Sequence, residues 1–454
     1  MEEKFDLTGT VAAYVAGVKA KQVPAGVAER TKLHILDTIG AMLSGSLLKP
    51  GRLIIECARR HGGHPEASVV ASDLRTNAVQ AALANGVLAH ADETDDAHFP
   101  TVTHPGSVVV PAALAVGERE HCSGNDLITA VVLGYDIMCR TSKALDRTWM
   151  SQRGLHSGSI SAGFGAAAAA GRLLRLSERQ IRYAMAFAGT QACGLYTWRQ
   201  DPEHIDKALC FSGVPARNGV TAALWAQAGL TATSAIFDGP DNLFKAFCDE
   251  PRPTELTHEL GSRYEILDTS IKKYPAGQPV QATLEGYFRL VKEHELKGSD
   301  IRDVLVRLPE SQAETVNDRL MPDVNCQYLL AVAMLDGKID FESAHDFDRM
   351  RTADVLEMKK RVRLAADAEL TRRHPAVRAA IVEITTSDGR HFEMLVDPLP
   401  GAPYNPLPAA DVEAKFLSLS TPVLGETRAR SVAARVSGLE DISDIAALGA
   451  LLRV

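Results

Sequence analysis

A run of small residues at positions 162–174, AGFGAAAAAGRLL, constrains the fold of this 454-residue chain more than any other feature. Alanine and glycine have little or no side chain, so a helix built from them lets other helices approach it closely. We therefore expect this run to form a central helix, packed on all sides within a helical domain. Helical spacing of apolar residues supports this prediction and occurs at residues 27–43, 78–88, 108–118, 125–145, 177–189 and 219–228.

After residue 260 the pattern changes to strands with helices among them. Residues 263–271 and 301–308 predict strands, and residues 379–396 predict a hairpin around an Asp-Gly turn. Helical patterns return after a cluster of proline and glycine at residues 398–408. The expected fold is mainly α, with a large all-α domain formed by residues 1–264 and 406–454 and a smaller inserted α+β domain at residues 265–405.

Composition limits the partners and the compartment that we expect. The chain has 49 Lys and Arg residues against 57 Asp and Glu residues, a net charge of −8, and no strongly basic segment that would indicate nucleic-acid binding. Any site for an anion must therefore use a local cluster of bases. No apolar run is long enough to span a membrane, no secretory signal is visible, and seven scattered cysteines are typical of reduced thiols. These features predict a cytoplasmic protein.

The densest group of polar residues is the segment HADETDDAHFPTVTHPGS at positions 90–107. One interpretation is an exposed acidic loop that caps the next helix through Ser107. A second is a divalent-metal site for a diphosphate substrate, although no CxxC or HExxH pattern accompanies it. A third is a catalytic loop whose acids orient His98 or His104 as a general base.

A second candidate site precedes the small-residue helix, in Gly-Leu-His156-Ser-Gly. There His156 either caps the helix or faces an anion beside free backbone N–H groups. Lys207 and Arg217 both precede the helix predicted at residues 219–228. A solvated side chain is the ordinary explanation for a single Lys or Arg.

The later part of the chain offers two adjacent lysines and a phenol. Lys272 and Lys273 follow a predicted strand, so we expect only one of them to face a given side. Tyr328 follows Asn-Cys-Gln and is either packed or available for binding.

Taken in order, these motifs resemble those of the MmgE/PrpD family over about residues 5–425. The matching segments are HADETDDAH, THPGSVVVPAALAVGE, GLHSGSISAGFGAAAAAGRLL, K-x-L-x-x-S-G-x-x-A-R-N-G, FDGPDNLFKAF, IKKYPAGQPVQATLEG and GAPYNPLPAADVEAKF. The family includes 2-methylcitrate dehydratases, cis-aconitate decarboxylases and iminodisuccinate epimerase. The resemblance implies a helical domain completed by both chain ends, an inserted α+β lid domain, a homodimer, and no metal or organic cofactor.

The resemblance also implies which residues line the catalytic cleft. The expected catalytic residues are Glu93, His104, His156, Lys207 and Lys272. The expected substrate-binding residues are Asp96, His98, Arg217, Lys273 and Tyr328. No metal ligand is expected among them.

The chain departs from the family pattern at several of these motifs. Glu93 replaces an aspartate, Ala97 replaces a threonine, and Gly277 and Gln281 stand where many members carry a Cys or His and a further His. The segment at residues 196–204 is lengthened, which is expected to reshape the pocket. These departures weigh against a decarboxylase and a standard 2-methylcitrate dehydratase.

The function expected from this resemblance is a cofactor-independent lyase of the dehydratase type. It would act at carbon next to a carboxylate of a small di- or tricarboxylate, where cations stabilise the developing charge. Within the family, the alternatives are epimerisation of a dicarboxylate such as iminodisuccinate, which the departures favour, and decarboxylation of the cis-aconitate type. The alternative from another class is a non-catalytic dicarboxylate-binding protein.

Overall fold

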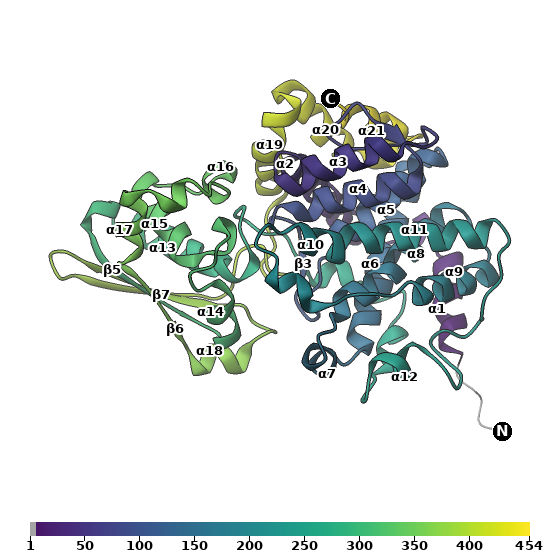
Figure 1. Cartoon of the computed structure of the whole chain (residues 1–454), viewed down its shortest axis with the longest axis horizontal. Coiled ribbons are helices and arrows are strands. Elements are labelled where there is room, and N and C mark those ends of the chain that lie inside the picture. The colour runs from purple at the N-terminus through teal and green to yellow at the C-terminus, as the bar shows by residue number, and fades with distance from the viewer. Residues whose placement is uncertain (1–5) are drawn as a thin grey trace. The chain divides into compact units, whose positions relative to one another are not determined.

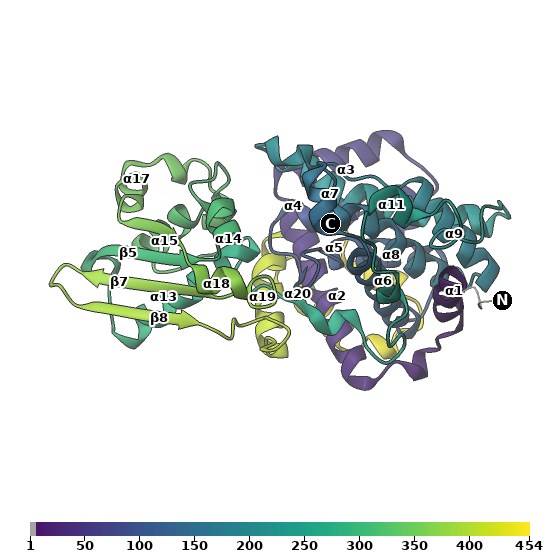
Figure 2. The same cartoon turned by 90° about the horizontal axis from the view of Figure 1, so that it is seen from below.

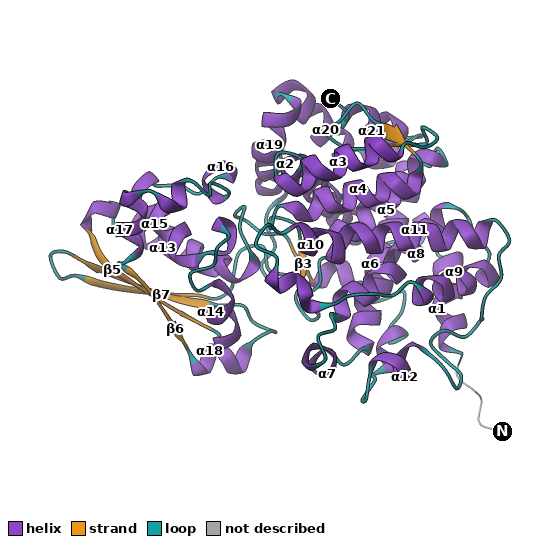
Figure 3. Cartoon of the chain, viewed as in Figure 1, coloured by secondary structure: helices purple, strands orange, loops and turns teal. Residues whose placement is uncertain are grey.

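A computed structural model describes residues 6–454 of the chain. The chain forms two compact units (Figure 1). Unit 1 runs to Thr269 and resumes at Ala409–Val454, and unit 2 comprises Ser270–Pro408. Helices predominate and the strands are concentrated in unit 2 (Figure 3), so the predicted mainly α fold class is confirmed. Among residues 6–454, none of the helices combines the length and the apolar character that a bilayer crossing requires.

Unit 1 is built almost entirely of helices. They are α1 (Leu7–Gly17), α2 (Ala25–Gly45), α3 (Lys49–His61), α4 (Ala78–Ala91), α5 (Gly106–Arg119), α6 (Gly124–Ala144), α7 (Arg147–Gln152), α8 (Ser157–Leu173), α9 (Glu178–Thr190), α10 (Ile205–Ala208), α11 (Val214–Gln227), α12 (Leu243–Phe247), α19 (Ala409–Leu424), α20 (Glu426–Ser437) and α21 (Ala446–Leu451). Short strands β1 (Ala67–Ser68) and β2 (Arg75–Thr76) pair antiparallel, and β3 (Ala97–His98) lies in the acidic segment.

The small-residue run forms α8, which is buried along nearly its whole length, as predicted. Helices α5, α6 and α11 pack around it (Figure 1). A Cβ on Gly165 would lie 2.7 Å from the carbonyl oxygen of Gly134 in α6, and one on Gly219 in α11 would lie 2.4 Å from Cβ of Ala166. The glycines therefore set the distance between these helices, because side chains would force them apart.

The C-terminal segment of the chain packs against its N-terminal half within unit 1. Helix α19 packs on α2, where Gly40 faces the ring of Phe416. An ion pair also joins them, because Nζ of Lys415 lies 2.6 Å from the Asp37 carboxylate. Burial raises the pKa of Asp37 to about 6, even though the charge of Lys415 opposes that shift.

Unit 2 holds a four-stranded sheet in the order β6-β5-β7-β8. The strands are β5 (Ile301–Leu308), β6 (Val362–Ala366), β7 (Ala380–Thr386) and β8 (His391–Val396); β5 is parallel to β6 and antiparallel to β7. The predicted hairpin forms between β7 and β8, which run side by side in Figure 2. The helices of this unit are α13 (Gln281–Glu293), α14 (Glu310–Val316), α15 (Cys326–Asp336), α16 (Phe341–Ala344), α17 (Ala353–Lys359) and α18 (Ala368–Arg373).

The strand predicted at residues 263–271 is wrong for most of its length. Glu265–Asp268 form the single helical turn η5, and only Thr269–Ser270 (β4) are extended. The turn forms because Asp136 accepts the Glu265 backbone N–H at 2.7 Å, a tertiary contact that local propensity does not reveal.

Candidate active site

The acidic segment between α4 and α5 is buried. Glu93 is 5% exposed, and Asp92, Asp95 and Asp96 are fully buried. The exposed-loop interpretation is therefore wrong. Capping through Ser107 is also wrong, because α5 begins without a side-chain cap and the Ser107 hydroxyl donates to the His104 carbonyl oxygen at 3.0 Å.

Asp96 anchors the start of α5. One of its carboxylate oxygens accepts from His34 Nδ1 at 2.8 Å and from the Tyr135 hydroxyl at 2.6 Å, and the other accepts from the Gly106 backbone N–H at 2.9 Å. Both oxygens are thus engaged within unit 1. The role of Asp96 in substrate binding stays a prediction.

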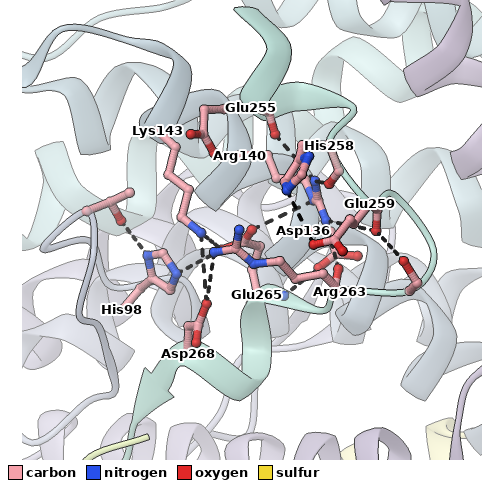
Figure 4. Close-up of polar contacts among 12 residues, drawn as sticks. His98, Asp136, Arg140, Lys143, Glu255, His258, Glu259, Arg263, Glu265 and Asp268 are labelled. Carbon is pink, nitrogen blue, oxygen red and sulfur yellow. Dashed lines mark hydrogen bonds and ion pairs between the residues drawn. The ribbon is translucent and has the colours of Figure 1, made fainter. Parts of the chain in front are cut away.

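His98 joins a second polar cluster rather than the one that contains His104. Its Nε2 lies 3.0 Å from the Glu265 carboxylate, to which Lys143 also donates (Figure 4). Its Nδ1 lies 2.7 Å from the Thr101 hydroxyl. Burial lowers the pKa of His98, so the ring is held neutral against the influence of Glu265.

His104 and His90 share the carboxylate of Asp95. Nδ1 of His90 lies 2.8 Å and Nδ1 of His104 lies 3.3 Å from the same oxygen of Asp95. Nδ1 of His104 also lies 2.8 Å from the Asp96 backbone carbonyl oxygen, which can only accept. The hydrogen of neutral His104 therefore resides on Nδ1, which leaves a lone pair on Nε2. His104 is thus arranged as a proton acceptor.

His156 has the opposite arrangement. It is the N-cap of α8, and its Nδ1 accepts the Ser159 backbone N–H at 3.1 Å, so the capping interpretation is confirmed. In neutral His156 the hydrogen must therefore reside on Nε2. Burial lowers the pKa of His156 to about 3, and the charges of His104, Lys207 and Arg199 add to that effect. His156 is thus a neutral hydrogen-bond donor at physiological pH.

The two histidines meet around Phe211. The centroid of the Phe211 ring lies 4.2 Å from that of His156, 5.7 Å from that of His104 and 5.1 Å from that of His90. Phe211 belongs to Leu209–Gly213 (η3), a π-helical turn between α10 and α11. Such wide turns are frequent at functional sites, because they place one side chain out of the ordinary helical register.

Lys207 and Glu93 complete this group. Lys207 forms an ion pair with Glu93, and its ammonium nitrogen lies 5.2 Å from the Phe211 ring centroid. His204 donates from Nε2 to the His90 carbonyl oxygen at 3.0 Å and lies 3.6 Å from Glu93. Burial lowers the pKa of His204 to about 3, with the charge of Lys207 acting in the same direction. Four predicted residues thus lie in one cluster: Glu93, His104, His156 and Lys207.

The remaining predicted residues are Arg217 in unit 1 and three residues of unit 2. Arg217 on α11 donates to the side-chain oxygen of Asn218 at 2.9 Å. In unit 2, Lys273 pairs with Glu285 at 2.7 Å, while Lys272 is buried, so the two adjacent lysines do differ in environment. The hydroxyl of Tyr328 donates to the Ser343 carbonyl oxygen at 2.6 Å.

Three groups of histidine and acidic side chains among residues 6–454 are close enough to share a cation. They are His90–Asp95–His104, His90–Glu93–His204 and His98–Glu265–Asp268. Lys207 and Lys143 already neutralise the glutamates of the last two groups, and in the first group both Nδ1 atoms donate their hydrogens. These donor sets do not favour a metal, and independence of metals stays a prediction.

The cluster also contains four residues that are not among the predicted site residues: His90, Asp95, His204 and Phe211. His90 and Asp95 lie inside the acidic motif, and their five-residue separation, from the end of a helix into a turn, gave no sign that they pair. Phe211 could not be distinguished from an ordinary core residue, because the π-helical turn that places it has no local sequence signal.

The fold and this cluster define a mainly α protein with buried histidines arranged for acid–base chemistry. Residues 9–256 match the MmgE/PrpD N-terminal domain and residues 274–441 match the MmgE/PrpD C-terminal domain. The chain therefore belongs to the MmgE/PrpD family and is an enzyme of that type.

Curated relatives match nearly the whole chain. A cis-aconitate decarboxylase of Aspergillus terreus is 26% identical over 99% of this chain and 96% of its own length. The cis-aconitate decarboxylase of Mus musculus is 27% identical over 98% of this chain and 93% of its own length. The cis-aconitate decarboxylase of Homo sapiens is 27% identical over 98% of this chain and 94% of its own length.

Proposed function

We propose that this protein is a lyase that acts at a carbon next to a carboxylate of a tricarboxylate, by a dehydratase-type reaction. The observation that carries the proposal is the pair of opposite tautomers, an acceptor Nε2 on His104 and a donor Nε2–H on His156. Removal of a proton next to a carboxylate needs a base and a donor for the oxygen that gains charge. These two rings supply one of each.

In the proposed dehydration, Nε2 of His104 takes the proton from the carbon next to the carboxylate. The electrons of that C–H bond form the double bond, the neighbouring C–O bond breaks, and the hydroxyl leaves as water after it takes a proton from Lys207. His156 remains neutral and donates to the carboxylate oxygen that gains charge. Glu93 holds Lys207 by their ion pair, so the ammonium is positioned before the substrate binds.

Decarboxylation is the second candidate, and the curated relatives favour it because they are cis-aconitate decarboxylases that match 98–99% of this chain. In that reaction a C–C bond breaks, carbon dioxide leaves, and the electron pair left on carbon takes a proton. The protonated form of His104 would supply that proton. The departures at Ala97, Gly277 and Gln281 weigh against this candidate, and they weigh equally against a standard 2-methylcitrate dehydratase.

We also propose roles for residues outside this cluster. Unit 2 is proposed to act as a lid, with Lys272, Lys273 and Tyr328 at the substrate. Asp96, His98 and Arg217 stay predicted substrate-binding residues, and the homodimer also stays a prediction.

Replacing each histidine of the pair tests the catalytic roles. We expect His104→Gln to lower kcat by about 10²–10⁴-fold, because it removes the base. We expect His156→Ala to lower kcat by about 10²–10³-fold, because it removes a donor to developing charge. The matched control is His121→Gln, since His121 also contacts a carboxylate through Nδ1, at 2.8 Å from Asp444, but is exposed. Unchanged turnover in His104→Gln would contradict the proposal.

The reaction type is distinguished by NMR in D₂O with citrate, 2-methylcitrate, cis-aconitate and iminodisuccinate. New alkene signals from a hydroxy acid indicate dehydration, and carbon dioxide release from cis-aconitate indicates decarboxylation. Deuterium incorporation without net product indicates epimerisation instead. Binding without any reaction indicates a non-catalytic binding protein. Dialysis against a chelator should leave the activity unchanged.

A further inference from the structure

A tricarboxylate brings three negative charges, and the lysine in the cluster with the two histidines is already neutralised. Lys207 is paired with Glu93, so one charge in this cluster cancels the other. Recognition of the substrate therefore requires a further cation that has no acidic partner. Arg199 satisfies this requirement, because among residues 6–454 no carboxylate forms an ion pair with it.

Arg199 lies in the lengthened segment, on the helical turn η2 (Tyr196–Gln200). The backbone before this turn pairs with the backbone that carries His156. The His156 N–H donates to the Gly194 carbonyl oxygen at 3.0 Å, and the Tyr196 N–H donates to the Gly154 carbonyl oxygen at 2.8 Å. These two hydrogen bonds fix η2 relative to His156.

Aromatic rings hold the guanidinium in place. The central carbon of the Arg199 guanidinium lies 3.9 Å from the ring centroid of Tyr196 and 5.8 Å from that of Trp198. The Tyr196 ring in turn packs against His156, at 5.1 Å between centroids. A guanidinium stacked on aromatic faces keeps its N–H edge available for a carboxylate.

The acidic residues nearest in sequence do not compete for this guanidinium. Asp201 accepts the backbone N–H groups of Glu203 at 2.9 Å and Asp206 at 2.6 Å, so it stabilises its own loop. Glu203 is paired with Lys49. The positive charge of Arg199 is also close enough to His156 to lower the pKa of that ring further than burial alone does.

We propose that Arg199 is a specificity-determining residue that binds the third carboxylate of the substrate, the group that distinguishes tricarboxylates from dicarboxylates. The inference rests on the proposed function in so far as the substrate is a polycarboxylate. A planar guanidinium binds a carboxylate through two parallel hydrogen bonds, which gives the interaction its geometric selectivity.

Calorimetric titration with two unreactive ligands tests this proposal. The ligands are propane-1,2,3-tricarboxylate and glutarate, which lacks the middle carboxylate. In Arg199→Ala we expect the Kd of the tricarboxylate to rise about 10–100-fold, and that of glutarate to rise less than about threefold, since only the first loses a charge-assisted pair. Arg199→Lys should recover the tricarboxylate affinity only in part, because an ammonium cannot bind a carboxylate through two parallel hydrogen bonds.

The matched control is Arg179→Ala, since Arg179 is exposed like Arg199 and also stacks on a tyrosine, 5.6 Å from the Tyr183 ring centroid, but lies on α9 and not on the turn beside His156. It should bind both ligands as the wild type does. Equal losses for the two ligands in Arg199→Ala, or no loss, would overturn the assignment, as would a wild type that does not bind the tricarboxylate. If binding of the tricarboxylate depends on Arg199 but no substrate is turned over, the proposed lyase reaction is contradicted and the assignment of Arg199 stands.

Discussion

At the scale of single residues, the proposed mechanism depends on two ring nitrogens. Nε2 of His104 accepts and Nε2–H of His156 donates, because the backbone occupies Nδ1 of each ring in the opposite sense. Asp95 adds a charge beside His104, at 3.3 Å from its Nδ1. That carboxylate stabilises the imidazolium that forms when His104 has taken a proton, as the carboxylate of a catalytic triad does.

Asp95→Asn tests this positioning role. The amide keeps the shape of the side chain but removes the charge, so we expect kcat to fall about 10–100-fold and the acid limb of the pH–rate profile to move to lower pH. A purely structural role would instead lower the melting temperature and leave the profile in place. Glu203→Gln is the control, since Glu203 is paired with a lysine on the surface.

The sequence singles out individual candidate residues but not their partners. The acidic motif and His156 indicated where candidate chemistry lies, and the structure brings Glu93, His104, His156 and Lys207 together. The partner of His98 could not be predicted, because Glu265 lies 167 positions further along the chain. Similarly, Tyr135 binds Asp96 from 39 positions away.

At the scale of elements, the contact between α4 and η3 fixes Phe211. A Cβ on Gly86 would lie 2.9 Å from Cα of Gly213, so these backbones touch because neither residue has a side chain. The same helix carries His90, which stacks on Phe211 with a 10° angle between the rings. The position of Phe211 thus depends on the spacing between α4 and η3.

Gly86→Ala should displace η3 and reduce activity. The added methyl group meets backbone atoms, which cannot move as a flexible side chain would, so we expect kcat/KM to fall at least tenfold and the melting temperature to drop. Gly163→Ala is the control, because a Cβ there meets nothing closer than 4.0 Å and alanine favours the helix by up to about 1 kcal/mol. Wild-type kinetics in Gly86→Ala would show that the spacing is not critical.

The helices themselves were readily predicted from their apolar spacing and small residues. The extra residue in the η3 turn was not, since a π-helical turn arises from tertiary packing and has no repeating pattern. The wrongly predicted strand at 263–271 has a similar cause, because Asp136 on α6 sets the conformation at Glu265.

At the scale of the whole molecule, buried ionisable groups make stability depend on pH. Asp136 accepts from the Tyr14 hydroxyl and from the Glu265 N–H at 2.7 Å each, and Figure 4 shows Arg140 beside it, bonded to carbonyl oxygens of residues 255–263. Burial raises the pKa of Asp136 to about 7, although the charge of Arg140 opposes the shift. The folded protein therefore holds a proton here that the unfolded chain has already lost above its ordinary pKa of 3.8.

For such a group, the free energy of unfolding is highest at low pH and falls as the pH rises from about 4 to about 7. Asp136→Asn removes this pH-dependent contribution to the free energy of unfolding, and the asparagine side chain can still contact both Tyr14 and Glu265. We expect the stability of the variant relative to wild type to increase between pH 5 and 7, by at most about 1.4 kcal/mol per pH unit. Urea unfolding at several pH values measures this difference. Asp249→Asn, on the surface, should show no such trend, and a flat difference for Asp136→Asn would contradict the prediction.

The capping of α8 by His156 has a consequence for how this enzyme tolerates mutation. The group that selects the tautomer of His156 is the amide of residue 159, which every amino acid except proline possesses, and His104 is likewise set by a carbonyl oxygen. In the proposed mechanism, main-chain groups therefore set the direction of proton transfer at both rings. If Arg199 binds the substrate as proposed, substrate preference can change through that side chain while the main chain keeps the tautomers of His104 and His156.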